Sequence, residues 1–173
     1  MRLFISINFD GDTKNRIIRV QDKLREMGRG NFTREENLHL TLAFLGEVPA
    51  DRVDDVKHAM DNIAVHKMKL QFADTGCFAR DSELWWIGIT ENKTLSGLQR
   101  ALVREIKDRN LPVDSKKFRP HITLVREMHI GKIDSRMLLP EPFSTEADSI
   151  SLMVSERING KLTYTEIYKV GAR

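Results

Sequence analysis

The chain has 173 residues and a mass of 20.0 kDa, a length typical of one domain around one hydrophobic core. Hydrophobic residues make up 40% and charged residues 31%, which excludes collagen-like, disordered and membrane-embedded chains. The formal charge of +3 permits an anionic ligand without requiring one. The single cysteine, Cys77, excludes an internal disulfide and a thiolate zinc cluster, so we expect a reducing compartment and a cytoplasmic protein. The apolar run at the N-terminus ends at Asp10 and Asp12 after about one strand's length, so we expect neither a signal peptide nor a membrane span.

Alternating apolar residues predict strands, and apolar residues spaced three and four apart predict helices. In chain order, strands are expected around residues 3–9, 38–44, 68–72, 85–89 and 150–154, and helices around 13–27, 53–63 and 95–106. Asp12 or Thr13 is the expected N-cap of the first helix, and Gly28 is its expected end. A loop or crossover is expected between His129 and Thr145. The order of elements is therefore β-α-β-α-β, then β-α-β, then β-β.

A constant offset in residue number relates the two halves of the chain. Adding 82 moves the first predicted strand onto the strand at 85–89, and moves Val20 and Leu24 of the first helix onto Leu102 and Ile106. This period is far longer than that of solenoid repeats, so it indicates one duplicated β-α-β unit. We therefore expect residues 1–173 to form one domain with two pseudo-symmetric lobes.

The same offset superimposes two copies of the motif H-x-T-L. His39 and Thr41 belong to the first copy, and His121 and Thr123 to the second. On a strand, residues i and i+2 point to the same side, so each histidine shares a face with its threonine while the apolar neighbours face the core. A pseudo-two-fold axis between the lobes would bring two imidazoles and two hydroxyls together across a groove.

Two histidines and two hydroxyls suit displacement at phosphorus. Such a reaction needs a base for the attacking oxygen and an acid for the leaving oxygen, and histidine performs either role near neutral pH. Threonine hydroxyls donate hydrogen bonds to the phosphate oxygens. The sequence shows no H-E-x-x-H motif and no cysteine cluster, so we expect a reaction without a metal or another cofactor.

The paired motifs, with Phe44-Leu45-Gly46 after the first and Arg119-Pro120 before the second, resemble those of the two-histidine (2H) phosphoesterases. Within that superfamily, they resemble the LigT-type RNA 2′,3′-cyclic phosphodiesterases, historically called 2′-5′ RNA ligases. The resemblance implies a bilobal α+β fold of duplicated β-α-β units, in which antiparallel-rich sheets line a central cleft. It also implies hydrolysis of an RNA-terminal 2′,3′-cyclic phosphate to a 2′-phosphate, with RNA or oligonucleotide ends as partners. We expect the protein to be a monomer.

The resemblance also implies a role for each motif residue. His39 corresponds to the family's proton donor to the departing 3′ oxygen, and His121 to its proton acceptor. Thr41 and Thr123 would hold the phosphate oxygens. One departure is Ala43, which occupies a position where many relatives carry lysine before Phe-Leu-Gly.

Other substrate-binding candidates lie near the two motifs. Arg119 has the parity of His121, and Arg126 matches an arginine that relatives often carry after the second motif. The parity of Arg126 points away from His121, so a bulge or strand end would be needed for it to reach phosphate. The candidates for stacking a terminal base are the aromatic residues Phe9, Phe44, Phe78, Trp85 and Trp86.

Alternative functions use the same residues. A 2′-5′ RNA ligase, a 2′-5′ phosphodiesterase or an enzyme for small cyclic nucleotides would need the same acid and base. A non-catalytic RNA- or nucleotide-binding module on the same fold is the alternative from another class. The intact histidine and threonine in both copies argue against it, because a binding module needs no matched acid and base.

Overall fold

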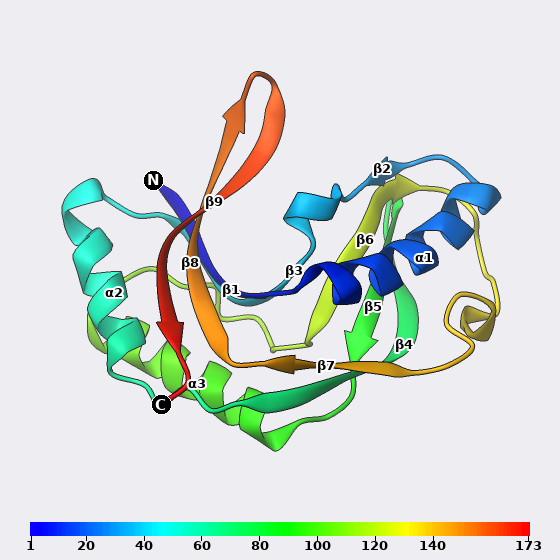
Figure 1. The fold of residues 1–173 in the computed structure, drawn as a ribbon. Helices are drawn as coiled ribbons and strands as arrows, with labels where there is room; N and C mark the ends of the chain where they lie inside the picture. Colours follow the sequence, from blue (N-terminus) through cyan, green and yellow to red (C-terminus); the bar gives the residue numbers. More distant parts are fainter.

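The computed structural model describes residues 1–173 as two antiparallel sheets with three α-helices (Figure 1). The first sheet has the order β3-β1-β8-β9, formed by β3 (His39–Glu47), β1 (Arg2–Asn8), β8 (Ser149–Ile158) and β9 (Lys161–Gly171). The second has the order β2-β6-β5-β4-β7, formed by β2 (Asn31–Phe32), β6 (His121–Met128), β5 (Glu83–Ile89), β4 (Met68–Ala79) and β7 (Phe143–Ala147). Every strand pair is antiparallel, which confirms the expected α+β class.

The three helices are α1 (Gly11–Met27), α2 (Val53–Asp61) and α3 (Lys93–Asp108). Helix α1 starts earlier than predicted, because the side chain of Asp10 accepts a hydrogen bond from the backbone N–H of Thr13 and caps the helix. It ends at Gly28 as predicted. No helix of the chain is both long and apolar enough to cross a membrane.

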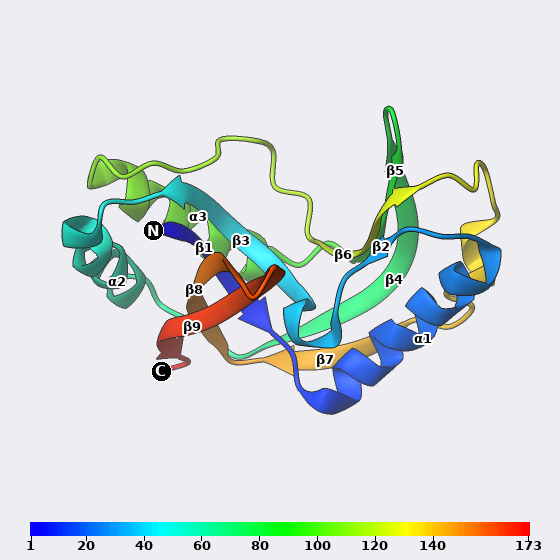
Figure 2. The same cartoon turned by 90° about the horizontal axis from the view of Figure 1, so that it is seen from above.

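Each duplicated unit places its helix on the sheet of the other unit. Helix α1 follows β1 of the first sheet but covers the second sheet, whereas α3 follows β5 of the second sheet but packs with α2 on the first (Figures 1 and 2). Two glutamines mark the exchange: Gln21 of α1 donates to the carbonyl of Leu124 in β6, and Gln99 of α3 donates to the carbonyl of Leu42 in β3. The two lobes are therefore interleaved.

The segment predicted as a loop between His129 and Thr145 contains the start of a strand. β7 begins at Phe143 and pairs with β4 along Met68–Phe72, at the edge of the second sheet. Its sequence Phe-Ser-Thr-Glu-Ala lacks the alternation of a half-buried strand, so the sequence did not predict it. The segment is extended because it pairs with β4.

A β-bulge interrupts both motif-bearing strands at equivalent positions. The ladder between β3 and β1 skips Leu42, and the ladder between β6 and β5 skips Leu124. The offset between the motifs also relates these leucines, so the bulges follow the internal repeat. A bulge inserts one residue into the pleat, and the residues beyond it therefore change face. Phe44 and Arg126, which follow the two bulges, move to the faces that carry His39 and His121.

The ladders also refine the repeat. His39 pairs with Asn8, and His121 pairs with Gly88, so the offset is 80 between the first strands of the two units and 82 between the motif strands. Both offsets are even, and side chains on a strand alternate with a period of two. The core-facing residues of one unit therefore align with core-facing residues of the other at either offset.

Gln21 is expected to stabilise the bulge of β6. Its side-chain amide donates to the carbonyl oxygens of Thr33 and Leu124, each at 2.9 Å, and the residue is 1% exposed. Replacing it by leucine preserves much of the volume but removes both donors, so Gln21→Leu should lower the free energy of unfolding by about 1–3 kcal/mol. Urea denaturation of the purified variant measures this loss.

Gln99→Leu is the matched comparison. Gln99 makes a single, longer hydrogen bond of 3.3 Å to Leu42 and is half-buried, so its replacement should cost less. A Gln21→Leu variant as stable as the native protein, or no more affected than Gln99→Leu, would contradict this role.

Candidate active site

The motif histidines begin the two strands that meet between the sheets. His39 is the first residue of β3 and His121 is the first residue of β6, and these strands contact each other at the centre of the molecule (Figure 2). We call the sides of the sheets that carry these residues the histidine faces. The apolar neighbours Leu40 and Ile122 are fully buried on the opposite sides, as the alternation predicted.

Backbone carbonyls fix the orientation of both imidazoles. Nδ1 of His39 lies 2.6 Å from the carbonyl oxygen of Asn37, and Nδ1 of His121 lies 2.6 Å from that of Arg119. Because a carbonyl only accepts hydrogen bonds, each Nδ1 carries a proton and each neutral ring has an unprotonated Nε2. This contact was not predicted from the sequence, although the offset between the motifs also relates Asn37 to Arg119.

The two threonines lie on the histidine faces, each two residues after its histidine. Oγ1 of Thr41 is 2.8 Å from Nε2 of His39, and the hydroxyl of Thr123 has no hydrogen-bond partner within the protein. Both residues are half-buried. The Thr41 hydroxyl therefore donates to the unprotonated Nε2 of His39, and the Thr123 hydroxyl is free to donate to a bound anion.

Arg126 reaches the histidine face because of the bulge at Leu124. Simple alternation pointed this arginine away from His121, and the skipped residue reverses that direction. The guanidinium is exposed, takes part in no ion pair, and its positive charge contributes to lowering the pKa of His39. The structure thus brings the charge of Arg126 into the electrostatic environment of His39.

The structure corrects the expected orientation of Phe44. The alternation grouped it with Leu40 and Leu42 on the apolar face, but the bulge at Leu42 turns it to the histidine face, where it pairs with Phe4. The guanidinium of Arg2 lies 5.0 Å from its ring centroid. Phe44 therefore occupies in the first unit the position that Arg126 occupies in the second.

Arg119 lies outside the strand, before Pro120 and the start of β6. Its side chain is exposed and makes no hydrogen bond or ion pair, whereas its carbonyl oxygen orients His121. The backbone of Arg119, rather than its charge, is thus the part that the structure brings to the histidine.

Aromatic rings flank each imidazole. Phe4 and Tyr164 pack against His39, with ring centroids 4.9 and 5.2 Å from it. Phe78 and Trp86 lie beside His121, at 5.6 and 6.3 Å. No sequence pattern indicated Tyr164, which reaches His39 from β9 at the far end of the chain.

The sequence and the fold both match known proteins. The family model described as LigT like Phosphoesterase matches residues 7–86, which include the first motif. An RNA 2′,3′-cyclic phosphodiesterase of Thermotoga maritima is 30% identical over 131 residues, which cover 73% of this chain and 70% of that protein. The chain belongs to the LigT-like phosphoesterase family.

Relatives of this LigT-like phosphoesterase extend the match over the whole chain. The RNA 2′,3′-cyclic phosphodiesterase of Escherichia coli is 27% identical over 170 residues, covering 96% of this chain and 93% of that protein. The crystal structure of E. coli LigT in its apo form superimposes with a TM-score of 0.84 at 26% identity, covering 99% of this chain and 96% of that one. A crystal structure of E. coli LigT complexed with 3′-AMP gives a TM-score of 0.83 at the same identity, covering 99% and 96% of the two chains.

The environment of His39 in the LigT-like phosphoesterase favours the neutral imidazole. Burial lowers the pKa of His39, although its hydrogen bond to the Asn37 carbonyl opposes the shift. The positive charges of His121, Arg126 and Lys14 lower this pKa further. At neutral pH the unliganded protein therefore holds His39 mainly as a neutral ring.

An NMR titration of the imidazole should show this shift. We expect His39 to titrate below its ordinary value of 6.5, so that less than half of it is protonated at pH 6.5. Inorganic phosphate should raise the midpoint, because a bound anion stabilises the imidazolium. The signal is assigned by its loss in His39→Ala, and a midpoint at or above 6.5 in the phosphate-free protein would contradict the prediction.

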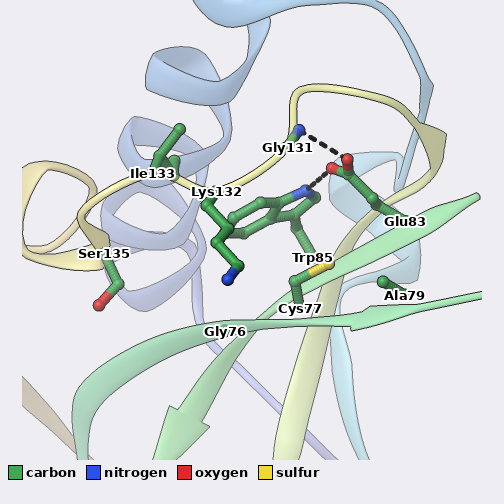
Figure 3. Close-up of a pocket in the computed structure, with 9 residues that line it drawn as sticks. All are labelled: Gly76, Cys77, Ala79, Glu83, Trp85, Gly131, Lys132, Ile133 and Ser135. Atoms are coloured by element: carbon green, nitrogen blue, oxygen red, sulfur yellow. Dashed lines mark hydrogen bonds between the residues drawn. The ribbon is translucent and has the colours of Figure 1, made fainter.

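A cavity of about 440 Å³ in the LigT-like phosphoesterase lies on the reverse side of the second sheet (Figure 3). Trp85 and Cys77 line it, and Lys132 extends across it. The Glu83 carboxylate accepts hydrogen bonds from Nε1 of Trp85 and from the backbone N–H of Gly131, which holds the loop over the cavity. None of the motif residues lines this cavity, so it is separate from the histidine faces.

Potential metal ligands are not gathered anywhere in the chain. No group of three or more histidine, cysteine, aspartate or glutamate side chains is placed to hold a metal ion. A reaction without metal stays a prediction from the sequence.

Proposed function

We propose that this LigT-like phosphoesterase hydrolyses the 2′,3′-cyclic phosphate at RNA ends to a 2′-phosphate, using His39 and His121 as acid and base. The observation that carries the proposal is the repeated arrangement in which each imidazole binds the carbonyl two residues earlier through Nδ1. The relatives from T. maritima and E. coli, both named RNA 2′,3′-cyclic phosphodiesterase, support the substrate class. The interleaved lobes support treating residues 1–173 as one two-histidine domain.

The proposed reaction is an in-line displacement at phosphorus. Unprotonated Nε2 of His121 accepts a proton from water while the water oxygen forms a bond to phosphorus. The bond between phosphorus and the 3′ oxygen breaks on the opposite side, and that oxygen takes a proton from Nε2 of His39. The products are a 2′-phosphate and a free 3′-hydroxyl, and proton exchange with solvent restores both imidazoles.

Thr41, Thr123 and Arg126 are proposed to hold the non-bridging phosphate oxygens. Hydroxyl and guanidinium donors stabilise the negative charge that grows on these oxygens as water attacks. Thr41 already lies at hydrogen-bonding distance from His39, and the hydroxyl of Thr123 and the guanidinium of Arg126 have no partner within the protein that a substrate would have to displace.

The low pKa of His39 fits a donor role once substrate is bound. A protonated His39 is scarce in the free protein at neutral pH, since burial and neighbouring positive charges disfavour it. The negative phosphate offsets these charges and favours the imidazolium in the complex. The protonated imidazole of His39 would then form in the substrate complex, and its low pKa makes the proton easier to transfer to the leaving oxygen.

Three substrates distinguish this proposal from its alternatives. An oligonucleotide ending in a 2′,3′-cyclic phosphate, a 2′-5′-linked oligonucleotide and a 2′,3′-cyclic mononucleotide are assayed under the same conditions. We expect the highest kcat/KM for the cyclic-phosphate-ended oligonucleotide. Turnover confined to the 2′-5′ linkage or to the mononucleotide would replace the proposed substrate, and tight binding without turnover of any substrate would favour a binding module.

A further inference from the structure

The cavity on the reverse side of the second sheet lies over two cross-strand pairs of unequal size. Cys77 of β4 lies opposite Trp85 of β5, and residues in direct register share a face of the sheet. Two residues further along β4, Ala79 lies opposite Glu83. The short side chains on β4 leave space beside the long ones on β5, and all four residues line the cavity (Figure 3). Its volume of about 440 Å³ is within the usual range of small-molecule sites.

The carboxylate of Glu83 is already occupied by donors of the protein. It accepts hydrogen bonds from Nε1 of Trp85 at 2.9 Å and from the backbone N–H groups of Ile130 and Gly131 at 2.9 and 2.7 Å. Burial raises the pKa of Glu83, but these hydrogen bonds lower it overall, so the carboxyl group is ionised at neutral pH. Its negative charge therefore fixes the loop over the cavity and leaves the indole N–H with a partner.

Lys132 is the one cation among the residues that line the cavity, and its side chain extends across it (Figure 3). Its ammonium makes no ion pair, whereas Asp134 and Arg136 of the same loop pair with each other at 3.0 Å. Cys77 and Ile133 provide apolar lining next to this charge. An ammonium beside an apolar lining is complementary to a molecule that joins an apolar body to one negative charge.

We propose that this cavity binds a small apolar monocarboxylate, at a site separate from that of phosphoester hydrolysis. The apolar body would pack between Cys77 and Ile133, and the carboxylate would accept a hydrogen bond from the ammonium of Lys132. The sequence made Trp85 a candidate for stacking a terminal base, but the structure buries it beneath this cavity, on the side opposite the motif histidines. The inference does not rest on the proposed function, because no motif residue lines the cavity.

Calorimetry with octanoate and its neutral counterpart octanamide tests the role of the charge. The native protein should bind octanoate about 2- to 5-fold more tightly, the effect of one ion pair with an exposed lysine. Lys132→Met keeps much of the side-chain length without the charge and should remove this preference. Lys107→Met, which removes an exposed lysine on α3, is the matched control and should keep it. Absence of octanoate binding, or a preference that survives Lys132→Met, would overturn the proposal.

Alkylation of Cys77 tests the place of binding. Cys77 is the single cysteine of the chain, so its modification by iodoacetamide, followed by mass, reports on the cavity alone. Burial and the negative charge of Glu83 raise the pKa of the thiol, so the reaction is run at alkaline pH. Octanoate at about ten times its Kd should slow alkylation about tenfold, because only the unoccupied site reacts. An unchanged rate at that concentration would overturn the site.

The histidine face is the competing location for a carboxylate. Octanoate bound near the guanidinium of Arg126 would lose affinity in Arg126→Ala and leave Cys77 fully reactive, which would overturn the cavity site. We expect Arg126→Ala to bind octanoate as the native protein does, with Cys77 protected. Failure of the native protein to hydrolyse a cyclic-phosphate-ended oligonucleotide would contradict the proposed function and leave this binding result unchanged.

Discussion

Replacing either His39 or His121 by alanine is expected to lower kcat/KM for a cyclic-phosphate-ended oligonucleotide by about 10²- to 10⁴-fold. The reason is that each imidazole moves one of the two protons that the displacement requires, and no other titratable side chain hydrogen-bonds to either ring. Initial rates at subsaturating substrate, with the secondary structure of each variant checked by circular dichroism, measure the effect.

The double variant and a surface control make this experiment specific. Because acid and base act in the same step, the double variant should lose much less than the product of the two single losses. His58→Ala removes an exposed histidine on α2 and should retain the native rate. Near-native rates in both single variants would show that the reacting groups lie elsewhere.

Arg126→Ala is expected to lower kcat by about 10²- to 10³-fold, the usual effect of removing one donor that stabilises developing charge. The guanidinium is exposed and unpaired on the histidine face, so its removal should leave the fold intact. Arg126→Lys should recover part of the rate, because it keeps the charge but loses the planar pair of donors. Steady-state kinetics of the two variants separate charge from geometry.

The control for charge alone is Arg136→Ala. The side chain of Arg136 is 87% exposed on the loop behind the second sheet, and its removal changes the net charge by the same amount. We expect no more than a small effect on KM for the oligonucleotide. Equal losses in Arg126→Ala and Arg136→Ala would reduce the role of Arg126 to long-range attraction of RNA.

The placement of side chains was predicted best on the regular strands. His39 and Thr41 share a face because the alternation of β3 is unbroken between them, and the same holds for His121 and Thr123 in β6. A regular period of two carries this information in the sequence itself. The constant offset between the motifs added the relation between the two strands, which neither motif alone supplies.

The directions of Phe44 and Arg126 were predicted less well, because each follows a bulge. A bulge shifts the alternation by one residue. In the sequence it is indicated by two adjacent apolar residues, which the structure buries: Leu42-Ala43 and Leu124-Val125. Their repetition at the same offset was a readable signal. Recognising it would have placed Arg126 on the same face as His121 from the sequence alone.

No sequence pattern indicates that each unit's helix packs on the sheet of the other unit. The apolar stripe of α1 shows that one face is buried, but it does not say which sheet covers that face. Tyr164 and Phe78 likewise reach the histidines through strand pairings that join distant parts of the chain. These contacts depend on the order of strands in the sheets, which a local sequence pattern cannot predict.

The most direct test of a two-histidine displacement is the position of the phosphate after turnover. The native protein is incubated with an RNA ending in 2′,3′-cyclic phosphate in the presence of EDTA, and the product is identified by mass and by comparison with 2′- and 3′-phosphate standards. We predict complete conversion to the 2′-phosphate with the addition of one water. A 3′-phosphate product, or turnover only after a divalent cation is restored, would contradict the roles assigned to His39 and His121.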